Sequence, residues 1–403
     1  MDALSFEQAR AVIAAEVPLI SAAADVVEHV PLELAAGRIL AEDIAADRDY
    51  PPFDRAARDG FAVRSTDIAN PPARLRVIGE TRAGAASRYR VDAGEAVEIM
   101  TGAPGPEGAD CVVMVEYTRR DGNHVVIQQS LPPGRNFVAR GSESAAGARV
   151  LHAGIRLEYS QIGVLASVGK PSVLVFRQPR VAILSTGDEV IDIEQTPESF
   201  QVRNSNAYSL AAQVWRRGGI PEILPIALDR FDETKALIEA GLQSDMLLLS
   251  GGVSMGKYDL VEDVFAELEA KLFFTKVLIQ PGKPLVFGRA AGKPFFGLPG
   301  NPISTMVTFE IFGSLALARL AGAADASLPF TEAVLAEDFR HNPSLTRFLP
   351  ARLEGEYGQS RVSPVKWQGS GDLASIAKAN CFLVASADRE SWDAGERIAV
   401  LPI

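Results

Sequence analysis

Four glycine-containing loops carry the residue types that could hold a charged ligand. They cover residues 185–189 (STGDE), 250–256 (SGGVSMG), 281–284 (PGKP) and 298–302 (LPGNP), and each follows or adjoins an apolar run. Glycine lets the backbone approach a ligand closely, and a helix N-terminus after such a loop favours anions. In a parallel α/β sheet, ligands bind at the carboxyl ends of the strands. Four such loops at one sheet edge therefore predict an anionic or nucleotide ligand.

Carboxylates and lysines lie close to these and other loops. Asp59, Glu189, Asp229 and Asp259 each sit in or beside a Gly- or Pro-rich segment. Taken singly, each is equally a helix cap or a surface acid, but gathered together they would suit Mg²⁺ bound to substrate phosphates. Two lysines could neutralise phosphate as point charges or remain ordinary solvated side chains: Lys276 and Lys283.

Two motif matches in the second loop indicate other chemistries. Residues 251–257 match the phosphate-binding loop of NTPases, but Tyr258 stands where a Ser or Thr should hold Mg²⁺. Residues 252–256 match the nucleophile elbow of serine hydrolases, with Ser254 as nucleophile. That mechanism needs a downstream histidine, and only His341 follows, beyond the predicted α/β region. A chance match explains the hydrolase pattern better.

Composition narrows the functional class. The 403 residues are 47% hydrophobic and 23% charged, which excludes global disorder and suggests two to four domains. The formal net charge of -11 disfavours nucleic acid and anionic membranes as partners. Cys111 and Cys381 are too few for a disulfide framework or a thiolate zinc site. Without 18 consecutive apolar residues or a secretory signal pattern, we expect a cytoplasmic protein.

The elements that must position these residues fall into segments of different character. A helix is predicted from the capping box of Ser5 and Gln8 up to Pro18, followed by a strand and turn over 31–43. Residues 74–140 are β-rich, with a hairpin expected between 111–115 and 124–127. A strand over 148–151 and a helix after Ser160 return to mixed character. A β-rich segment bracketed by mixed ones suggests an inserted domain.

From residue 180 onward, strands and helices alternate. Apolar runs predict strands at 181–184, 222–227, 246–249, 285–287 and 294–297. Helices are expected over 207–217, 233–242 with Asp232 as N-cap, 260–270, and 303–320 with Asn301 and Pro302 at its start. This pattern predicts an α/β domain with a largely parallel sheet. After residue 327, short β segments and one helical turn near 372–378 suggest a small β-barrel or sandwich.

Taken together, the motifs are highly specific. Besides the four loops they include 51–54 (PPFD), 59–64 (DGFAVR), 100–104 (MTGAP) and 106–110 (PEGAD). In this order and spacing, over nearly the whole chain, they resemble the molybdopterin molybdotransferase family, the MoeA-type proteins that include the gephyrin E domain. The resemblance implies an α/β and β multidomain protein. Its domains would be 1–46 with 141–177 (elongated, mixed α/β), 47–140 (inserted, β-rich), 178–326 (molybdopterin-binding-type α/β, parallel-dominated sheet) and 327–403 (C-terminal β-barrel).

The resemblance also implies an activity. Family members insert molybdate into the dithiolene of adenylylated molybdopterin, and Mg²⁺-assisted cleavage of the adenylate gives molybdenum cofactor and AMP. They form homodimers whose cleft combines the second domain of one subunit with the third of the other. Contact with the molybdopterin adenylyltransferase that supplies the substrate is expected. The alternative is a non-catalytic, gephyrin-like scaffold or pterin-binding protein. The sequence does not distinguish molybdate from tungstate.

Residue roles follow from the same resemblance. Asp59, Thr101 and Glu143 match second-domain or flanking catalytic positions, and Glu189 and Asp259 match third-domain acids assigned to catalysis and metal binding. The matching substrate-binding positions are Asp229, Ser250, Gly251, Gly252, Lys276, Lys283, Pro299, Pro302, Arg347 and Ser370.

Three positions depart from the family pattern. Glu143 stands at a usual aspartate position, Gln280 at a position that is lysine in some members, and Arg58 at a frequent methionine. The longer Glu143 can still reach a site, whereas Gln280 removes a cation that would attract an oxyanion. None of the three removes a core motif.

Overall fold

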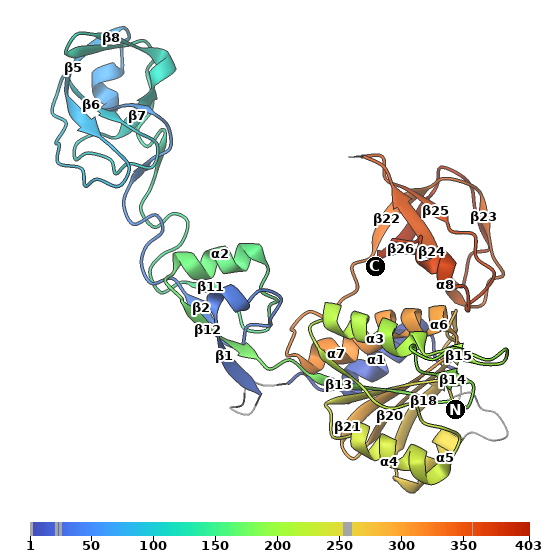
Figure 1. Ribbon diagram of the computed structural model, residues 1–403. Helices are drawn as coiled ribbons and strands as arrows, with labels where there is room; N and C mark the ends of the chain where they lie inside the picture. Colours follow the sequence, from blue (N-terminus) through green and yellow to red (C-terminus); the bar gives the residue numbers. More distant parts are fainter. Residues whose placement is uncertain (1–2, 21–22, 24–25, 253–259, 357) are drawn as a thin grey trace. The chain divides into compact units, whose positions relative to one another are not determined.

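A computed structural model describes residues 3–20, 23, 26–252, 260–356 and 358–403. The chain divides into two compact units, each described here by itself (Figure 1). The inserted unit comprises Glu42–Ala153 and Glu158–Ser172. The core unit comprises Met1–Ala41, Gly154–Leu157 and Val173–Ile403.

The inserted unit is built around a mixed sheet with the strand order β7-β4-β6-β5-β9-β8. Smaller pairs, β10 with β3 and β11 with β2, accompany it together with helix α2. The bounds are β2 (Ile44–Ala45), β3 (Arg55–Ala56), β4 (Gly60–Val63), β5 (Ala73–Thr81), β6 (Glu95–Ile99), β7 (Cys111–Met114), β8 (Thr118–Asp121), β9 (His124–Ile127), β10 (Phe137–Val138), β11 (Arg149–Leu151) and α2 (Tyr159–Ser167). Alternate side chains of β4 face opposite cores: Phe61 and Val63 pack on one side, Ala62 on the other.

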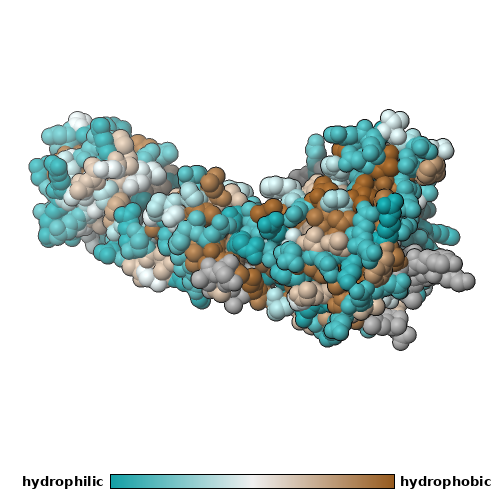
Figure 2. All heavy atoms as spheres, turned by 60° about the horizontal axis from the view of Figure 1, so that its bottom comes forward, coloured by the Kyte–Doolittle hydropathy of each residue, from teal (hydrophilic) through white to brown (hydrophobic). Residues whose placement is uncertain are grey.

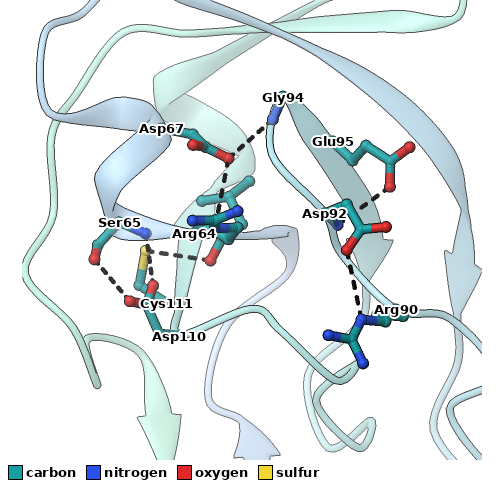
Figure 3. A network of polar contacts seen from close by, with 10 residues as sticks. Arg64, Ser65, Asp67, Arg90, Asp92, Gly94, Glu95, Asp110 and Cys111 are labelled. Carbon is teal, nitrogen blue, oxygen red and sulfur yellow. Dashed lines mark hydrogen bonds and ion pairs between the residues drawn. The ribbon is translucent and has the colours of Figure 1, made fainter.

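The last residue of the 106–110 motif, Asp110, fixes the segment that follows β4. The Asp110 carboxylate accepts hydrogen bonds from the Ser65 backbone N–H (2.6 Å) and from Ser65 Oγ (2.7 Å), as Figure 3 shows. In the same network the Asp67 carboxylate accepts from the Gly94 N–H at 3.0 Å. Burial, followed by the charge of Asp110, raises the pKa of the neighbouring Cys111 thiol to about 12. This motif is therefore structural, and the thiol is not reactive at neutral pH.

The core unit contains the predicted α/β layer. Its main sheet has the order β16-β13-β17-β21-β20-β18. β16, β13, β17 and β21 run parallel, while β20 and β18 are antiparallel. The bounds are β13 (Arg180–Ser185), α3 (Ser205–Arg216), β16 (Ile220–Ile223), α4 (Phe231–Gly241), β17 (Met246–Ser250), α5 (Leu260–Glu267), β18 (Lys271–Lys276), β20 (Pro284–Ala290) and β21 (Lys293–Leu298). The short pairs are β1 (Val27–Pro31) with β12 (Ser172–Phe176) and β14 (Val190–Ile191) with β15 (Val202–Arg203).

Helices cover both faces of this sheet (Figure 1). Alternate residues of β13 face opposite layers, which is why the strand is apolar throughout: Val181 and Ile183 pack beneath α3, and Ala182 and Leu184 pack against α4. N-terminal helix α1 (Phe6–Glu16) joins the α3 layer through Ala9 and Ile13. Its capping box of Ser5 and Gln8 is present as predicted.

The last helix of this layer contains a π turn. α6 (Pro302–Thr308) and α7 (Ser314–Leu320) flank a π-helical segment, Phe309–Gly313. The Arg10 guanidinium donates to the Ile311 carbonyl in that segment (2.5 Å) and to the Ala326 carbonyl (3.1 Å). Buried Glu310 pairs with Arg217 of the turn after α3. By length and hydropathy, Pro302–Leu320 could cross a membrane, but 78% of its most apolar window is buried, as in a core helix.

The C-terminal part closes into a small barrel. β24, β25, β22, β28 and β26 pair in sequence, and β26 pairs back with β24, while β19 extends the sheet beside β24. The bounds are β19 (Ile279–Gln280), β22 (Thr331–Leu335), β23 (Phe339–Arg340), β24 (Thr346–Glu354), β25 (Arg361–Pro364), α8 (Leu373–Ile376), β26 (Cys381–Ala385), β27 (Ser391–Trp392) and β28 (Arg397–Pro402). The predicted fold class is confirmed, with an α/β layer and a C-terminal barrel.

Three local predictions were wrong. β7 pairs with β4, and the hairpin joins β8 to β9, so the turn was right but one partner strand was not. The strand expected over 31–43 lies earlier, at β1. Helix α4 begins at Phe231, so Asp232 lies in its first turn and Arg230 is the N-cap. In the last two cases, residues with ordinary local propensity were placed by tertiary packing.

Candidate functional site

A cavity of about 920 Å³ opens at the carboxyl ends of the parallel strands in the core unit. Its volume is that of a pocket for a sizeable small molecule. Predicted residues contribute to its wall from three strand ends: Glu189 after β13, Ser250–Gly252 after β17, and Pro299 with Pro302 after β21. Pro284 of β20 and Gly371 of the C-terminal part also line it. The sequence motifs therefore converge in space as expected for strand-end loops.

Two glycines make the floor of this cavity possible. Gly251 and Gly252 both have positive φ, +93° and +60°. A Cβ at Gly252 would lie 2.5 Å from Thr186 Oγ1, and one at Gly251 would lie 2.8 Å from the Thr186 carbonyl oxygen. The loop after β17 can thus pack on the loop after β13 only because these positions carry no side chain.

Acidic side chains gather beside the cavity. The Asp229 backbone N–H donates to Asp188 Oδ1 at 3.0 Å. Burial first, and then the negative charges of Asp188 and Glu189, raise the pKa of Asp229. Among the described residues, no three His, Cys, Asp or Glu side chains form a metal-binding group. Predicted metal ligand Asp259 lies outside the described residues.

Basic residues of the prediction lie on connected strands of the core unit. Lys276 ends β18 opposite Pro284 of the cavity wall, and Lys283 immediately precedes that proline. β19 pairs with β24 in a register that sets Gln280 directly beside Arg347. The Nε of Arg347 is buried without a hydrogen-bond partner in the described chain. The departure at Gln280 therefore lies next to an arginine, which keeps a cation on this strand pair.

Ser370 is also tied to the cavity. Its carbonyl accepts a hydrogen bond from the Ile303 N–H at 2.9 Å, at the start of α6. That bond satisfies one of the free N–H groups of the helix N-terminus and links the C-terminal part to the Pro299–Pro302 turn. Ser370 therefore joins the predicted substrate loop through its backbone.

The inserted unit holds the second predicted group. Oδ1 of Asp59 accepts from the Thr101 backbone N–H (2.6 Å) and from Thr101 Oγ1 (2.8 Å). These hydrogen bonds, the backbone one first, lower the pKa of Asp59. The carboxylate is therefore ionised at neutral pH. It is exposed to solvent, and the two hydrogen bonds fix its orientation.

Glu143 is paired rather than free. Its carboxylate lies 2.9 Å from Arg55 Nη2, and both side chains are partly exposed. Arg55 lies in β3, which pairs with β10, and Glu143 follows β10 in the chain. The ion pair therefore joins the segment before the main sheet of this unit to the segment after it. Arg58, beside Asp59, is exposed.

Family models match almost the whole chain. The MoeA N-terminal region (domain I and II) matches residues 4–169, a probable molybdopterin binding domain matches 182–319, and the MoeA C-terminal region (domain IV) matches 332–403. The chain is 34% identical, over 385 residues, to the molybdopterin molybdenumtransferase of Bacillus subtilis, covering 93% of this chain and 90% of that one. The chain belongs to the MoeA family.

Further relatives and solved structures agree with this assignment. The molybdopterin molybdenumtransferase of Staphylococcus epidermidis is 33% identical over 378 residues, covering 93% of this chain and 90% of the relative. Two crystal structures of the MoeA protein of Pyrococcus horikoshii superpose with TM-scores of 0.81 and 0.73 at 29% and 33% identity. They cover all of this chain and 100% and 99% of theirs.

The serine hydrolase hypothesis is supported neither by the family models nor by the surroundings of His341. Ser254 lies outside the described residues. His341 is buried, its Nε2 lies 2.6 Å from the Arg389 carbonyl, and its ring packs against Phe339 and Trp392. In the MoeA fold this histidine is a core residue of the C-terminal barrel.

Sequence reasoning missed four consecutive polar residues of the cavity: Arg203, Asn204, Ser205 and Asn206. Asn204 caps α3 by accepting from the Ala207 N–H (3.2 Å) and the Ser185 hydroxyl (2.9 Å). The available signal was the pair of asparagines just before the expected helix, which helix-capping rules would have placed at the sheet edge.

Proposed function

We propose that this MoeA-family chain is a molybdopterin molybdenumtransferase, an enzyme of molybdenum cofactor biosynthesis. It would insert molybdate into adenylylated molybdopterin and release AMP. The observation that carries this proposal is the cavity at the sheet edge, because the strand-end motifs predicted to bind the substrate line it together. The name shared by the curated relatives supports the same reaction.

The cavity offers the groups that a phosphate-linked substrate needs. In this proposal the backbone N–H groups of Gly252, Gly300 and Asn301 would donate to phosphate oxygens, since the Gly251 N–H donates to the Leu298 carbonyl and the flanking prolines have none. Lys276, Lys283 and Arg347 do not line the cavity but lie on or beside strands close to it in sequence register, and in this proposal they would supply positive charge to attract the molybdate oxyanion. In this mechanism the two thiolates that bind molybdenum belong to the substrate, so neither buried cysteine takes part.

The acidic side chains fit a bound Mg²⁺. Burial first, and then the charges of Asp188 and Glu189, raise the pKa of Asp229, and a divalent cation would relieve the part that comes from the charges. Mg²⁺ is usually held by one or two protein carboxylates, substrate phosphates and water, so three protein ligands are not required. Glu189 and the predicted ligand Asp259 would hold it, and Asp229, whose charge interacts with that of Glu189, would add negative charge to the site. When bound, it would neutralise charge that develops on the phosphate as AMP leaves.

We further infer a homodimer in which Asp59 and Thr101 of one subunit serve the cavity of the other. The exposed apolar side chains of the core unit support an association surface: Tyr208 and Trp215 on α3 and Ile220 and Ile223 on edge strand β16. Figure 2 shows hydrophobic side chains reaching the surface of this unit. Asp59 would contribute a fixed negative charge that orients the substrate.

Two further proposals concern the setting of the reaction. We infer that the protein acts in the cytoplasm, which the two free, buried cysteines support. We also infer contact with the molybdopterin adenylyltransferase, because direct transfer would protect the adenylylated substrate. Neither nucleic acid nor a membrane enters this scheme.

The deciding experiment follows AMP release from adenylylated molybdopterin. Purified protein is incubated with substrate and Mg²⁺, with and without molybdate, and the product is assayed by activation of a cofactor-free molybdenum enzyme. We expect molybdate-dependent AMP release and active cofactor, and tungstate in parallel tests anion preference. Tight substrate binding without AMP release would instead support the scaffold alternative, and no binding would contradict the proposal.

A further inference from the structure

Asn206 joins three loops of the cavity. Its Nδ2 donates to Ser250 Oγ after β17 (2.7 Å) and to the Gly300 carbonyl after β21 (2.7 Å), while the residue itself lies in the first turn of α3. Because the Gly300 carbonyl can only accept, the atom facing it must be the amide nitrogen. The orientation of the Asn206 amide is therefore fixed, and its Oδ1 points elsewhere.

Among the described residues, that oxygen has no hydrogen-bond partner. Asn206 Oδ1 is buried and accepts no hydrogen bond from any described residue, and the same holds for the hydroxyl of Thr186. Both residues line the cavity, and Thr186 is only 5% exposed. Two buried polar atoms left unpaired in one cavity are costly unless a ligand completes them.

The chemistry of the two atoms defines the ligand group. Oδ1 of an amide is an acceptor only, so it needs an N–H or O–H donor. Ser250 Oγ already accepts from Asn206, so its own hydrogen can be donated to a ligand acceptor. The Thr186 hydroxyl can donate or accept. A donor beside an acceptor is the pattern on the edge of an amino-substituted heterocycle.

We propose that Asn206 is a specificity-determining residue that reads the amino-bearing edge of a heterocyclic ring in the substrate, with Thr186 completing the contact. This inference rests on the proposed function, since adenylylated molybdopterin carries two such rings, the pterin and the adenine. Asn206 then has two roles. Its amide nitrogen connects the loops after β17 and β21, and its amide oxygen selects the ring.

The test compares ligands in which the amino group is replaced by a carbonyl oxygen, which also turns the neighbouring ring nitrogen from an acceptor into an N–H donor and so reverses the pattern on that edge. Pterin is compared with lumazine, which carries oxygen in place of the 2-amino group, and AMP with IMP, which carries oxygen in place of the 6-amino group. Affinities are measured by ligand-observed NMR titration of the full-length protein. We expect the wild type to prefer one amino-bearing ring by about threefold to tenfold, and Asn206→Ala to abolish that preference. Loss of the pterin preference assigns the pterin, and loss of the AMP preference assigns the adenine.

Two further variants distinguish recognition of the ring from stabilisation of the loops. Thr186→Val keeps shape and removes the hydroxyl, and we expect it to weaken the same ring by about threefold. Ser209→Ala, which removes a hydroxyl from α3 that bonds to the Asn206 carbonyl and does not line the cavity, should change nothing. If Asn206→Ala does not fold, Asn206→Ser is used instead. Its shorter side chain cannot place an acceptor oxygen at the position of Oδ1, and it keeps a polar group on α3.

Equal weakening of both members of each ligand pair by the Asn206 variants would overturn the inference, because Asn206 would then only hold loops. So would a wild-type protein that shows no preference or binds none of the four ligands. A wild type that prefers the amino-bearing ring yet releases no AMP would retain the inference and reject the proposed function. An active wild type without preference would do the reverse.

Discussion

The two units present carboxylates in opposite states. In the inserted unit, Asp59 accepts two hydrogen bonds from Thr101, and its pKa is lowered. In the core unit, burial and the charges of Asp188 and Glu189 raise the pKa of Asp229. Thr101 satisfies Asp59 Oδ1 without a ligand, whereas no positive charge among the described residues offsets the raised pKa of Asp229. Under the proposed function, Asp59 would orient the substrate and Asp229 would contribute to cation binding.

Removing the Asp59 carboxylate should give the largest loss of AMP release. We expect Asp59→Ala to reduce AMP release by about 100-fold or more, because the charge and its fixed orientation are lost together. Folding should be unchanged, since the side chain is exposed. Asp121→Ala, an exposed aspartate of the same unit, is the matched control. Turnover within a few-fold of the wild type would remove Asp59 from the mechanism.

Changing Asp229 should alter the Mg²⁺ dependence of AMP release. Asp229→Asn is expected to raise the Mg²⁺ concentration needed for half-maximal AMP release by about 10-fold to 100-fold. Asp59→Asn should lower turnover without moving that concentration. Asp232→Asn, an exposed acid three residues along, serves as control. An equal Mg²⁺ shift in both site variants would break the distinction between the units.

A smaller effect is expected where Thr101 supports Asp59. Thr101→Val removes the Oγ1 hydrogen bond and keeps the backbone one, so turnover should fall less than about tenfold. Because hydrogen bonds lower the pKa of Asp59, losing one raises it, and the acid limb of the pH profile should move to higher pH. Thr101→Ser should leave the profile unchanged. A limb that stays in place in the valine variant would exclude Asp59 as its source.

The smallest effect concerns stability. The raised pKa of Asp229 means that ionising it costs the folded state free energy as pH rises through that pKa, and costs nothing below the ordinary aspartate range. Asp229→Asn should therefore stabilise the protein at pH 7 and not at pH 3. The gain should be about 0.5 kcal/mol or less, since the group is exposed and screened. Urea unfolding midpoints measure it, and a gain that persists at pH 3 would point to another cause.

Much of the fold could be predicted because its signals are local. Continuous apolar runs identified β13 and β17, and the Ser5 capping box identified the start of α1. The pairing of β7 with β4 was not predictable, because both strands suit several partners and only the packed sheet selects one. The π turn at Phe309–Gly313 was hidden for the same reason: Arg10 and Glu310 that accompany it are far apart in sequence.

The candidate site shows the same division. Glycine loops at strand ends pointed to the cavity, and the structure brings Ser250, Gly252 and Pro299 together there. Asn206 was missed because asparagine is common at helix starts, and Thr186 was included only as a member of the 185–189 loop, without a role of its own. Their significance lies in atoms left without partners, which depends on three-dimensional packing. Arg347 beside Gln280 likewise became visible only through strand register.

The hydrogen bond from Arg10 to Ile311 has a consequence for synthesis of the chain. The two residues are 301 positions apart, and Phe6 of the same helix also packs on Phe312, Phe330 and Phe348. At a translation rate of about 5 to 20 residues per second, α1 leaves the ribosome about 15 to 60 s before these partners exist. The segment made first therefore docks among the last. Until then its apolar face, with Ala9 and Ile13, is available to chaperones.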